Sequence, residues 1–232
     1  MANTKRQERR KKTLDSNTTR FDACWQYFNP PRRLHNATLD NYSPKTQSQQ
    51  DALIICRGYN IDKLQAGEGI FLVGTYGTGK THLSIATARN LIETSPELFG
   101  VRYNDSSMLY DPNREDCRGL YCSFFSVVEL LDMWRPGNEA KRQQGEWLFH
   151  RAKMDDLVIL DDIGAEKASE WTEDRLYAVV DARYRMERAT IFTTNCSEKE
   201  LLANGYGRIV SRIFEMTEPV QVTGPDYRRK RA

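Results

Sequence analysis

Short apolar runs alternate with longer amphipathic segments along most of the chain. Amphipathic helices are predicted at residues 47–66 and 81–93, where apolar positions recur with helical spacing. The strands predicted from the apolar runs are residues 70–73, 120–125, 157–160, 190–194 and 220–222. Because strands that alternate with helices form parallel sheets covered on both faces, the pattern predicts an α/β fold with a parallel sheet.

The two ends of this pattern suggest the domain organisation. Residues 1–20 show no apolar period, and aromatic residues from Phe21 to Phe28 come before Pro30-Pro31. We therefore expect a basic, largely disordered extension at 1–29 and a single globular domain at 30–232. Within that domain, residues 94–119 are polar and rich in turn-forming residues, so they are expected to be a surface insertion.

Composition excludes several classes of protein. The chain has 232 residues, of which 39% are hydrophobic, enough for one packed core. No run of 18 apolar residues and no signal-peptide pattern occur, so we expect a cytoplasmic protein without a membrane span. The five cysteines form no CxxC pair and have no nearby histidines at zinc-ligand spacing, which favours buried thiols over a metal site.

Positive charge is concentrated at the termini. Residues 1–12 contain six Lys or Arg and one Glu, and residues 226–232 contain four and one Asp. The two tails together carry +8 while the whole chain carries +2, which leaves −6 for the rest. Attraction to nucleic acid would therefore be strongest at the ends, and solvated, disordered tails are the alternative.

A glycine-rich loop lies between the strand predicted at 70–73 and the helix predicted at 81–93. Its residues are Gly74, Thr75, Tyr76, Gly77, Thr78, Gly79, Lys80 and Thr81. This spacing predicts a P-loop, in which bare backbone amides bind phosphate oxygens, Lys80 contacts the β- and γ-phosphates of ATP, and the Thr81 hydroxyl coordinates Mg²⁺. The backbone amide of His82 could reach a phosphate as well, and its ring is given no role. An ordinary glycine-rich turn is the alternative.

Two carboxylates follow the strand predicted at 157–160. Asp161 and Asp162 are expected at the carboxyl edge of a buried strand, where ligand and metal chemistry gathers in parallel sheets. Asp161 is the predicted Mg²⁺ ligand and Asp162 the group that orients or deprotonates the attacking water. Many related ATPases have Glu at the second position, so slow hydrolysis is expected. A strand cap without chemistry is the alternative.

Polar and basic residues further along complete the candidate set. Asn195 follows the strand at 190–194 and is suited to hydrogen-bond the attacking water or the γ-phosphate, although many such residues only form turns. Arg208 and Arg212 share one face of a predicted helix whose other face is apolar. Such an arginine could reach the ATP of a neighbouring subunit, or could belong to a solvated basic face.

Taken together, these residues resemble the DnaC/DnaI type of bacterial replicative helicase loader, a family of AAA+ ATPases that includes the IstB-like helper ATPases of transposons. The segments that carry the resemblance are residues 30–33, 36–39, 74–81, 160–166, 192–195 and 226–228.

The resemblance implies a five-stranded AAA+ P-loop fold with the Asn195 strand between the two nucleotide-binding strands. It also implies that Arg212 is an arginine finger, that Arg228 is a sensor 2 residue, and that the segment from Leu39 to Tyr42 packs near the adenine. Expected ligands and partners are ATP, Mg²⁺, single-stranded DNA, other copies of the chain and a hexameric replicative helicase. The short N-terminal extension departs from the separate helicase-binding domain usual in loaders.

The expected function is therefore that of an ATPase that helps to load a replicative helicase. A transposition helper that binds a transposase on duplex DNA is an alternative, because the same ATPase module serves both. A kinase for a small metabolite is a third possibility, since kinases also use P-loops. The acidic pair followed by Asn195 favours water as the phosphate acceptor.

Overall fold

The computed structural model describes residues 19–100, 119–134, 139–166 and 169–229. Within this part of the chain, a five-stranded sheet has the order β2-β3-β4-β1-β5, and all of its strand pairs are parallel. The strands are β1 (Gly69–Val73), β2 (Cys122–Ser126), β3 (Leu157–Ile163), β4 (Thr190–Thr194) and β5 (Thr217–Gln221). The predicted parallel α/β fold is confirmed, and β4, which leads to Asn195, lies between β1 and β3 as the resemblance implied.

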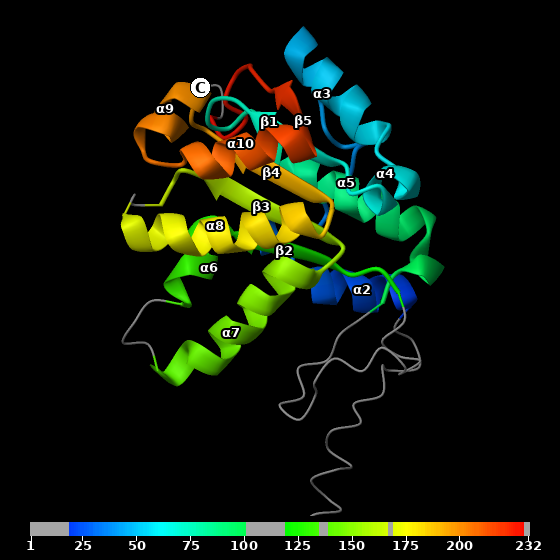
Figure 1. Cartoon of the computed structure of the whole chain (residues 1–232). Helices are drawn as coiled ribbons and strands as arrows, with labels where there is room; N and C mark the ends of the chain where they lie inside the picture. Colours follow the sequence, from blue (N-terminus) through cyan, green and yellow to red (C-terminus); the bar gives the residue numbers. More distant parts are fainter. Residues whose placement is uncertain (1–18, 101–118, 135–138, 167–168, 230–232) are drawn as a thin grey trace, which may run out of the picture.

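Helices cover both faces of the sheet (Figure 1). One face packs against α2 (Arg20–Phe28), α3 (Gln47–Arg57), α4 (Ile61–Gln65) and α5 (Lys80–Thr94). The other packs against α6 (Val127–Asp132), α7 (Glu139–Met154), α8 (Glu170–Arg185), α9 (Glu198–Ala203) and α10 (Gly207–Met216). Two short 3-10 helices, η1 (Arg32–Leu34) and η2 (Pro96–Leu98), lie in the connections.

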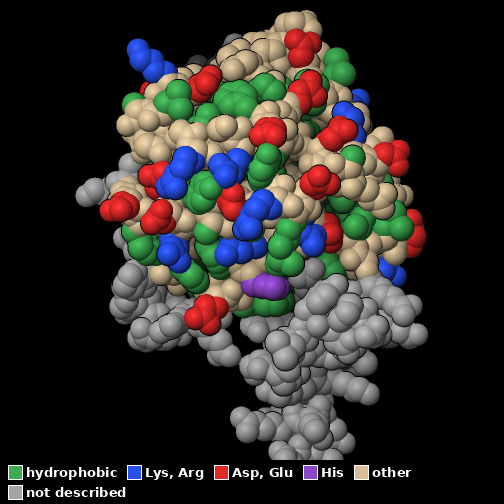
Figure 2. Space-filling view, viewed as in Figure 1, with side chains coloured by type: hydrophobic (Ala, Val, Ile, Leu, Met, Phe, Trp, Pro, Cys, Tyr) green, Lys and Arg blue, Asp and Glu red, His purple; other side chains and the backbone are tan. Residues whose placement is uncertain are grey.

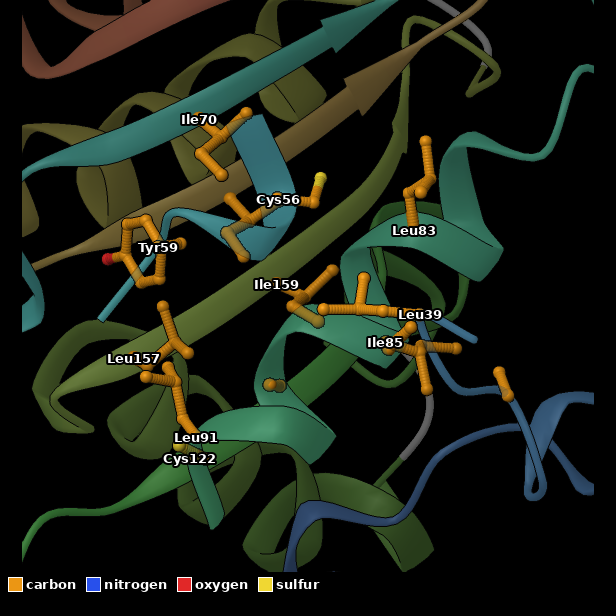
Figure 3. Close-up of a cluster of buried hydrophobic side chains, with 14 of the residues drawn as sticks. Leu39, Cys56, Tyr59, Ile70, Leu83, Ile85, Leu91, Cys122, Leu157 and Ile159 are labelled. Carbon is orange, nitrogen blue, oxygen red and sulfur yellow. The ribbon is translucent and has the colours of Figure 1, made fainter. Parts of the chain in front are cut away.

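The apolar face of α5 holds the helix that follows the glycine-rich loop against the sheet. Leu83, Ile85 and Leu91 are almost completely buried, and they lie against Ile70 and Ile159 of the central strands (Figure 3). Burial of each such side chain contributes about 1.5–3 kcal/mol. The start of α5, and with it the loop, therefore has a fixed position at the carboxyl edge of β1.

The predicted helix at 47–66 is two helices. Gly58 caps the end of α3, and the Asn60 side chain accepts a hydrogen bond from the amide of Lys63 at the start of α4. An Asn at the N-cap satisfies one of the free amides of a helix start, so the chain restarts there instead of continuing. The prediction of one continuous helix was therefore wrong.

The last strand is also displaced from its prediction. It covers Thr217–Gln221 and not 220–222, and it pairs with β1 from Gly69 onward. Glu218 and Pro219 are exposed on this edge strand, where proline is tolerated because one side of the strand needs no partner. These two residues come just before the apolar run at 220–222 from which the strand was predicted, so the prediction missed the start of the strand.

The N-terminal boundary differs from the expected one at residue 30. Residues 1–18, most of the expected extension, lie outside the described residues. Helix α2 begins after Thr19, whose side chain forms a reciprocal capping box with Asp22, and its residues Cys24, Trp25 and Phe28 belong to the core. The globular unit therefore includes α2. Most of the expected insertion at 94–119 also lies outside the described residues, and Phe99 and Leu120 on either side pair with each other.

Other expectations concerned cysteines and membranes. Of the cysteines described, Cys24, Cys56 and Cys122 are buried and Cys196 is half-buried, and all four are free thiols. Among the described residues, no helix has the length and apolar character that crossing a membrane requires.

Candidate functional site

A cavity of about 500 Å³ lies at the carboxyl edge of the sheet, beside the glycine-rich loop. It is lined by residues from the loop, from the ends of β3 and β4, from the segment before α3 and from the C-terminal segment. Its lining residues are Arg33, Leu34, Asn41, Tyr42, Ser43, Tyr76, Gly77, Gly79, Lys80, Thr81, His82, Asp161, Asp162, Thr193, Asn195, Tyr227 and Arg228. Residues predicted from distant parts of the sequence thus meet in one place.

The loop needs glycine at two of its turns. Gly77 and Gly79 have φ angles of 74° and 94°, in the left-handed region that favours glycine. A Cβ on Gly77 would overlap the Asp226 carboxylate, and a Cβ on Gly79 would come within 2.5 Å of the Tyr42 ring. Because both positions lack side chains, the loop can curve tightly and still be packed from outside by these two residues.

Lys80 is held in the cavity by three hydrogen bonds. Its Nζ donates to the carbonyl oxygens of Gly74 and Thr75, each at 2.8 Å, and to Oδ1 of Asn195 at 2.7 Å. Burial lowers the pKa of Lys80 to about 8, opposed by the carboxylates of Asp162 and Asp161. A phosphate anion would replace the partial charges of these acceptors with a full negative charge, so the site is built to favour an anion beside Lys80.

Asn195 connects Lys80 with Asp162. Its side-chain amide accepts from Lys80 and donates to Oδ1 of Asp162. The three side chains therefore form a continuous chain of hydrogen bonds across the mouth of the loop. Lys80 and Asn195 are 115 positions apart in the sequence, and the adjacency of β1 and β4 in the sheet brings them together.

A β-bulge at the end of β3 turns two consecutive carboxylates toward the same cavity. In a regular strand, neighbouring side chains point to opposite faces. Here the pairing of β3 with β4 shifts between Leu160 and Ile163, and Asp162 has a φ of 65°, which is unusual for a residue other than glycine. The Asp162 amide donates to Oγ1 of Thr193 at 2.8 Å, which stabilises this conformation.

Asp161 lies beside the first turn of α5. Its Oδ2 accepts from the Thr81 hydroxyl at 3.2 Å, and its Oδ1 accepts from the Thr193 hydroxyl at 2.7 Å. Burial raises the pKa of Asp161 above its usual range, while the bonds from Thr193 and Thr81 act in the opposite direction. Burial also raises the pKa of Asp162, opposed by the charges of Lys80 and Arg228.

Thr81 and Asp161 present the oxygen donors that Mg²⁺ prefers. The two oxygens are in direct contact, so an ion between them could bind both at once. The residues described contain no cluster of three His, Cys, Asp or Glu side chains able to hold a metal. Such a pair fits a Mg²⁺ ion that takes its remaining ligands from nucleotide phosphates and water, as is usual for this ion.

The outer wall of the cavity is aromatic. The Tyr42 hydroxyl donates to the carbonyl of Thr78 at 2.9 Å, and its ring lies against those of His82 and Tyr227. His82 Nε2 lies 2.9 Å from the carbonyl oxygen of Thr38, so its ring anchors the segment before Tyr42. Tyr76 extends from the loop and is 66% exposed at the edge of the cavity.

Arg212 is separate from this cavity. Its guanidinium donates to Asp181 Oδ1 at 2.9 Å and to the Tyr177 hydroxyl at 2.7 Å, and it lies over the rings of Tyr177 and Tyr184. These contacts are on the face formed by α8 and α10, where Figure 2 shows Lys and Arg side chains interspersed with acidic ones. Arg212 therefore does not line the cavity of its own chain, unlike Arg228.

Several residues of the cavity were missed by the sequence predictions. From within β4, the Thr193 hydroxyl donates to the Asp161 carboxylate and accepts from the backbone amide of Asp162, but the sequence of that strand indicates only a buried run of β-formers. Tyr227 and Asp226 touch the outside of the loop, and Arg33 lines the cavity. The only signal for Tyr227 and Asp226 was their place in a segment of family resemblance, which gave neither a role.

The relatives of this chain are bacterial helicase loaders. It is 26% identical over 175 residues to the replicative helicase loader DnaI of Bacillus subtilis, which covers 70% of this chain and 48% of DnaI. It is 23% identical over 184 residues to the replicative helicase loader DnaC of Escherichia coli, covering 78% of this chain and 65% of DnaC. The chain thus spans about half of DnaI and about two thirds of DnaC. No family model matches it.

Solved structures show the same fold. A crystal structure of the DnaC helicase loader is 26% identical and superposes with a TM-score of 0.61, covering 83% of this chain and 99% of that one. The replication initiator DnaA, solved with AMPPCP and single-stranded DNA, has a TM-score of 0.57 at 21% identity and covers 86% of this chain and 52% of that one. This second likeness bears on the fold alone. The chain has an AAA+ P-loop fold, and its resemblance to the DnaC/DnaI-type helicase loaders is confirmed by both sequence and structure.

Proposed function

We propose that this chain binds ATP with Mg²⁺, hydrolyses it to ADP and phosphate, and helps to load a hexameric replicative helicase onto single-stranded DNA. The observation that carries the proposal is the convergence of Lys80, Asn195 and Asp162 with the Thr81–Asp161 pair at one edge of the sheet. The similarity to helicase loaders supports the loading role. We place this activity in the cytoplasm.

In this proposal, the chain's residues position ATP and the attacking water. Amides of residues 74–82 would surround the phosphates and Lys80 would contact the β- and γ-phosphates. Thr81 and Asp161 would hold Mg²⁺, which would neutralise phosphate charge. Asp162 accepts a proton from the attacking water, and Asn195 fixes the position of both Asp162 and the γ-phosphate. Because Asn195 already contacts Lys80 and Asp162, it needs no large movement to do so.

Arg212 would serve a neighbouring subunit. Its position on α10, outside the cavity of its own chain, suits a residue that reaches the ATP of another copy and stabilises the charge of the transition state there. Assembly of several copies would then be required for full activity, and ATP binding would act as an assembly switch.

The assembly part is tested by measuring ATP hydrolysis per molecule over a range of protein concentrations. We expect the rate to rise with concentration for the wild type and to stay low for Arg212→Ala. Arg208→Ala is the matched control, since Arg208 lies one turn earlier on the same helix and pairs with Glu173. A rate independent of concentration, with Arg212→Ala unaffected, would exclude action in trans.

The loading part is tested by incubating the chain with candidate replicative helicases and with transposases, with and without ATP and single-stranded DNA, and by sizing the complexes. Capture of a helicase supports loading. Capture of a transposase alone would favour a transposition helper. Release of free phosphate, in place of a phosphorylated small molecule, separates both from a kinase.

A further inference from the structure

The C-terminal segment at residues 223–228 lies across the outside of the glycine-rich loop. It follows β5, whose position beside β1 is fixed by strand pairing, and the amide of Val222 still donates to Val73 at 2.7 Å. The start of α3 holds the segment through the Thr46 hydroxyl, which donates to the Thr223 carbonyl at 2.6 Å. We call residues 223–228 the strap.

Tyr227 joins the strap to the loop and to the segment around Tyr42 and Gln49. Its backbone amide donates to the carbonyl of Gly77 at 2.9 Å. Its hydroxyl donates to the carbonyl of Ser43 at 2.5 Å and lies 3.1 Å from Oε1 of Gln49, and its ring packs edge-on against Tyr42. Tyr42 and Gln49 in turn donate to the carbonyl of Thr78. Tyr227 is therefore fixed relative to the loop from several directions.

The two arginines after Tyr227 have different surroundings. Arg228 lines the cavity together with Lys80 and Asp162, and its charge lowers the pKa of both. In the part of the chain that the structure describes, no carboxylate lies within ion-pair distance of Arg228. Arg229, by contrast, is 88% exposed and lies 3.7 Å from Asp226. Only the first of the two can serve a ligand in the cavity.

We infer that Tyr227 is a positioning residue that holds Arg228 toward the γ-phosphate, so that the strap makes the site bind ATP more tightly than ADP. This inference rests on the proposed ATPase function and deepens it. A flexible arginine loses side-chain entropy when it binds phosphate, and the backbone beside it must also be fixed. Tyr227 fixes that backbone before the nucleotide arrives, because its ring packs against Tyr42 and its hydroxyl donates to Ser43, and these side-chain contacts hold its amide on the carbonyl of Gly77.

The experiment compares the dissociation constants of fluorescent ADP and of a non-hydrolysable ATP analogue. Because a charge-assisted contact with the γ-phosphate is lost, we expect Arg228→Ala to reduce the preference for the ATP analogue at least about tenfold. Tyr227→Ala should remove most of the same preference. Its affinity for ADP should stay within about twofold of the wild-type value, well below a tenfold change, which corresponds to 1.4 kcal/mol. Tyr227→Phe keeps the ring contact with Tyr42 and should therefore lose only a small part of the preference. Arg229→Ala is the control and should change neither constant.

The outcomes separate positioning from general support of the fold. If Tyr227→Ala weakens the binding of ADP and of the ATP analogue equally, Tyr227 only stabilises the loop and the inference is wrong. It is also wrong if Arg228→Ala loses the preference and Tyr227→Ala keeps it. Unfolding of each variant without nucleotide is followed in parallel, and Tyr227→Phe supplies the comparison if Tyr227→Ala unfolds. Should the wild type bind neither nucleotide, the proposed function itself would fail, and this inference with it.

Discussion

The amino and carboxyl edges of the sheet, where its parallel strands begin and end, both contain buried or half-buried charged residues, but they differ in what those residues contact. At the carboxyl edge, Lys80, Asp161 and Asp162 line a cavity and share a few polar partners. At the amino edge, Arg183 is fully buried. It donates to the Thr190 hydroxyl and to the backbone carbonyls of residues 152, 153, 155, 156 and 189.

A second group at the amino edge is equally enclosed by protein. Asp155 is completely buried and accepts hydrogen bonds from Tyr27, Ser123 and Arg151. These contacts join α2 to β2 and to the end of α7. The protein itself satisfies the charges of the amino edge, whereas those of the carboxyl edge lie open to an incoming ligand. The first arrangement stabilises the fold, and the second leaves binding capacity for an anion and a cation.

The largest effect is expected from Arg183→Ala at the amino edge. It would leave several buried carbonyls without a donor and would remove one of the two positive charges near Asp155, the other being Arg151, so we expect the free energy of unfolding to fall by about 3–5 kcal/mol. Urea unfolding measures this loss. The affinity of the remaining folded protein for ATP should not change. A variant as stable as the wild type would remove the distinction between the two edges.

Lys80→Ala is the corresponding change at the carboxyl edge. We expect the affinity for ATP to fall at least about 100-fold, because a charged contact to two phosphates is lost, equivalent to roughly 2.7 kcal/mol. The free energy of unfolding should change by less than about 1 kcal/mol, since removal of a buried charge offsets the loss of its hydrogen bonds. Nucleotide titration and urea unfolding on the same sample give both quantities. A large loss of stability would show that Lys80 also supports the fold.

The affinity for ATP should depend on pH through Lys80. Its pKa is about 8 in the free protein, and a bound phosphate raises it, so binding takes up a proton above pH 8. Below pH 8 the lysine is charged in both states and contributes no pH dependence. Above it, the affinity should fall by up to about tenfold, or 1.4 kcal/mol, per pH unit. Titrations between pH 7 and 9.5 test this, and Lys80→Arg, which stays charged, should show a flat profile.

The smallest effect is expected from Tyr27→Phe at the amino edge. The change removes the hydroxyl that donates to Asp155 and leaves the bonds from Ser123 and Arg151 in place. We expect a loss of about 1 kcal/mol in the free energy of unfolding. Hydrolysis of ATP per folded molecule should be unchanged. A reduced rate at full stability would connect α2 to the candidate site and contradict the separation of the two edges.

Much of the carboxyl edge could be predicted from the sequence because its signals are local. The spacing of glycines before Lys80 and Thr81, and the apolar run before Asp161, each depend on a few adjacent residues. The amino-edge network could not be predicted in the same way. Arg183 lies in an amphipathic helix where an arginine is ordinarily exposed, and its acceptors are backbone carbonyls, which have no sequence signature.

Errors in the predicted elements have equally specific causes. The helix predicted at 47–66 joined two helices because their apolar spacing continues across Gly58 and Asn60. Helix α2 was assigned to the extension because its nine residues follow a long polar segment, although they pack in the core. In both cases, tertiary packing and capping decided the limits of a helix, and periodicity alone does not contain that information.

The sequence by itself determined the parallel α/β class, the glycine-rich loop and the identity of the polar residues after each strand, because these depend on local spacing and on the alternation of strands and helices. Only the tertiary structure decided that the bulge at Asp162 turns two consecutive carboxylates into one cavity, that Asn195 joins Lys80 to Asp162, and that the strap reaches the loop. Those contacts depend on the order of strands in the sheet, which brings distant segments together through burial of their apolar faces.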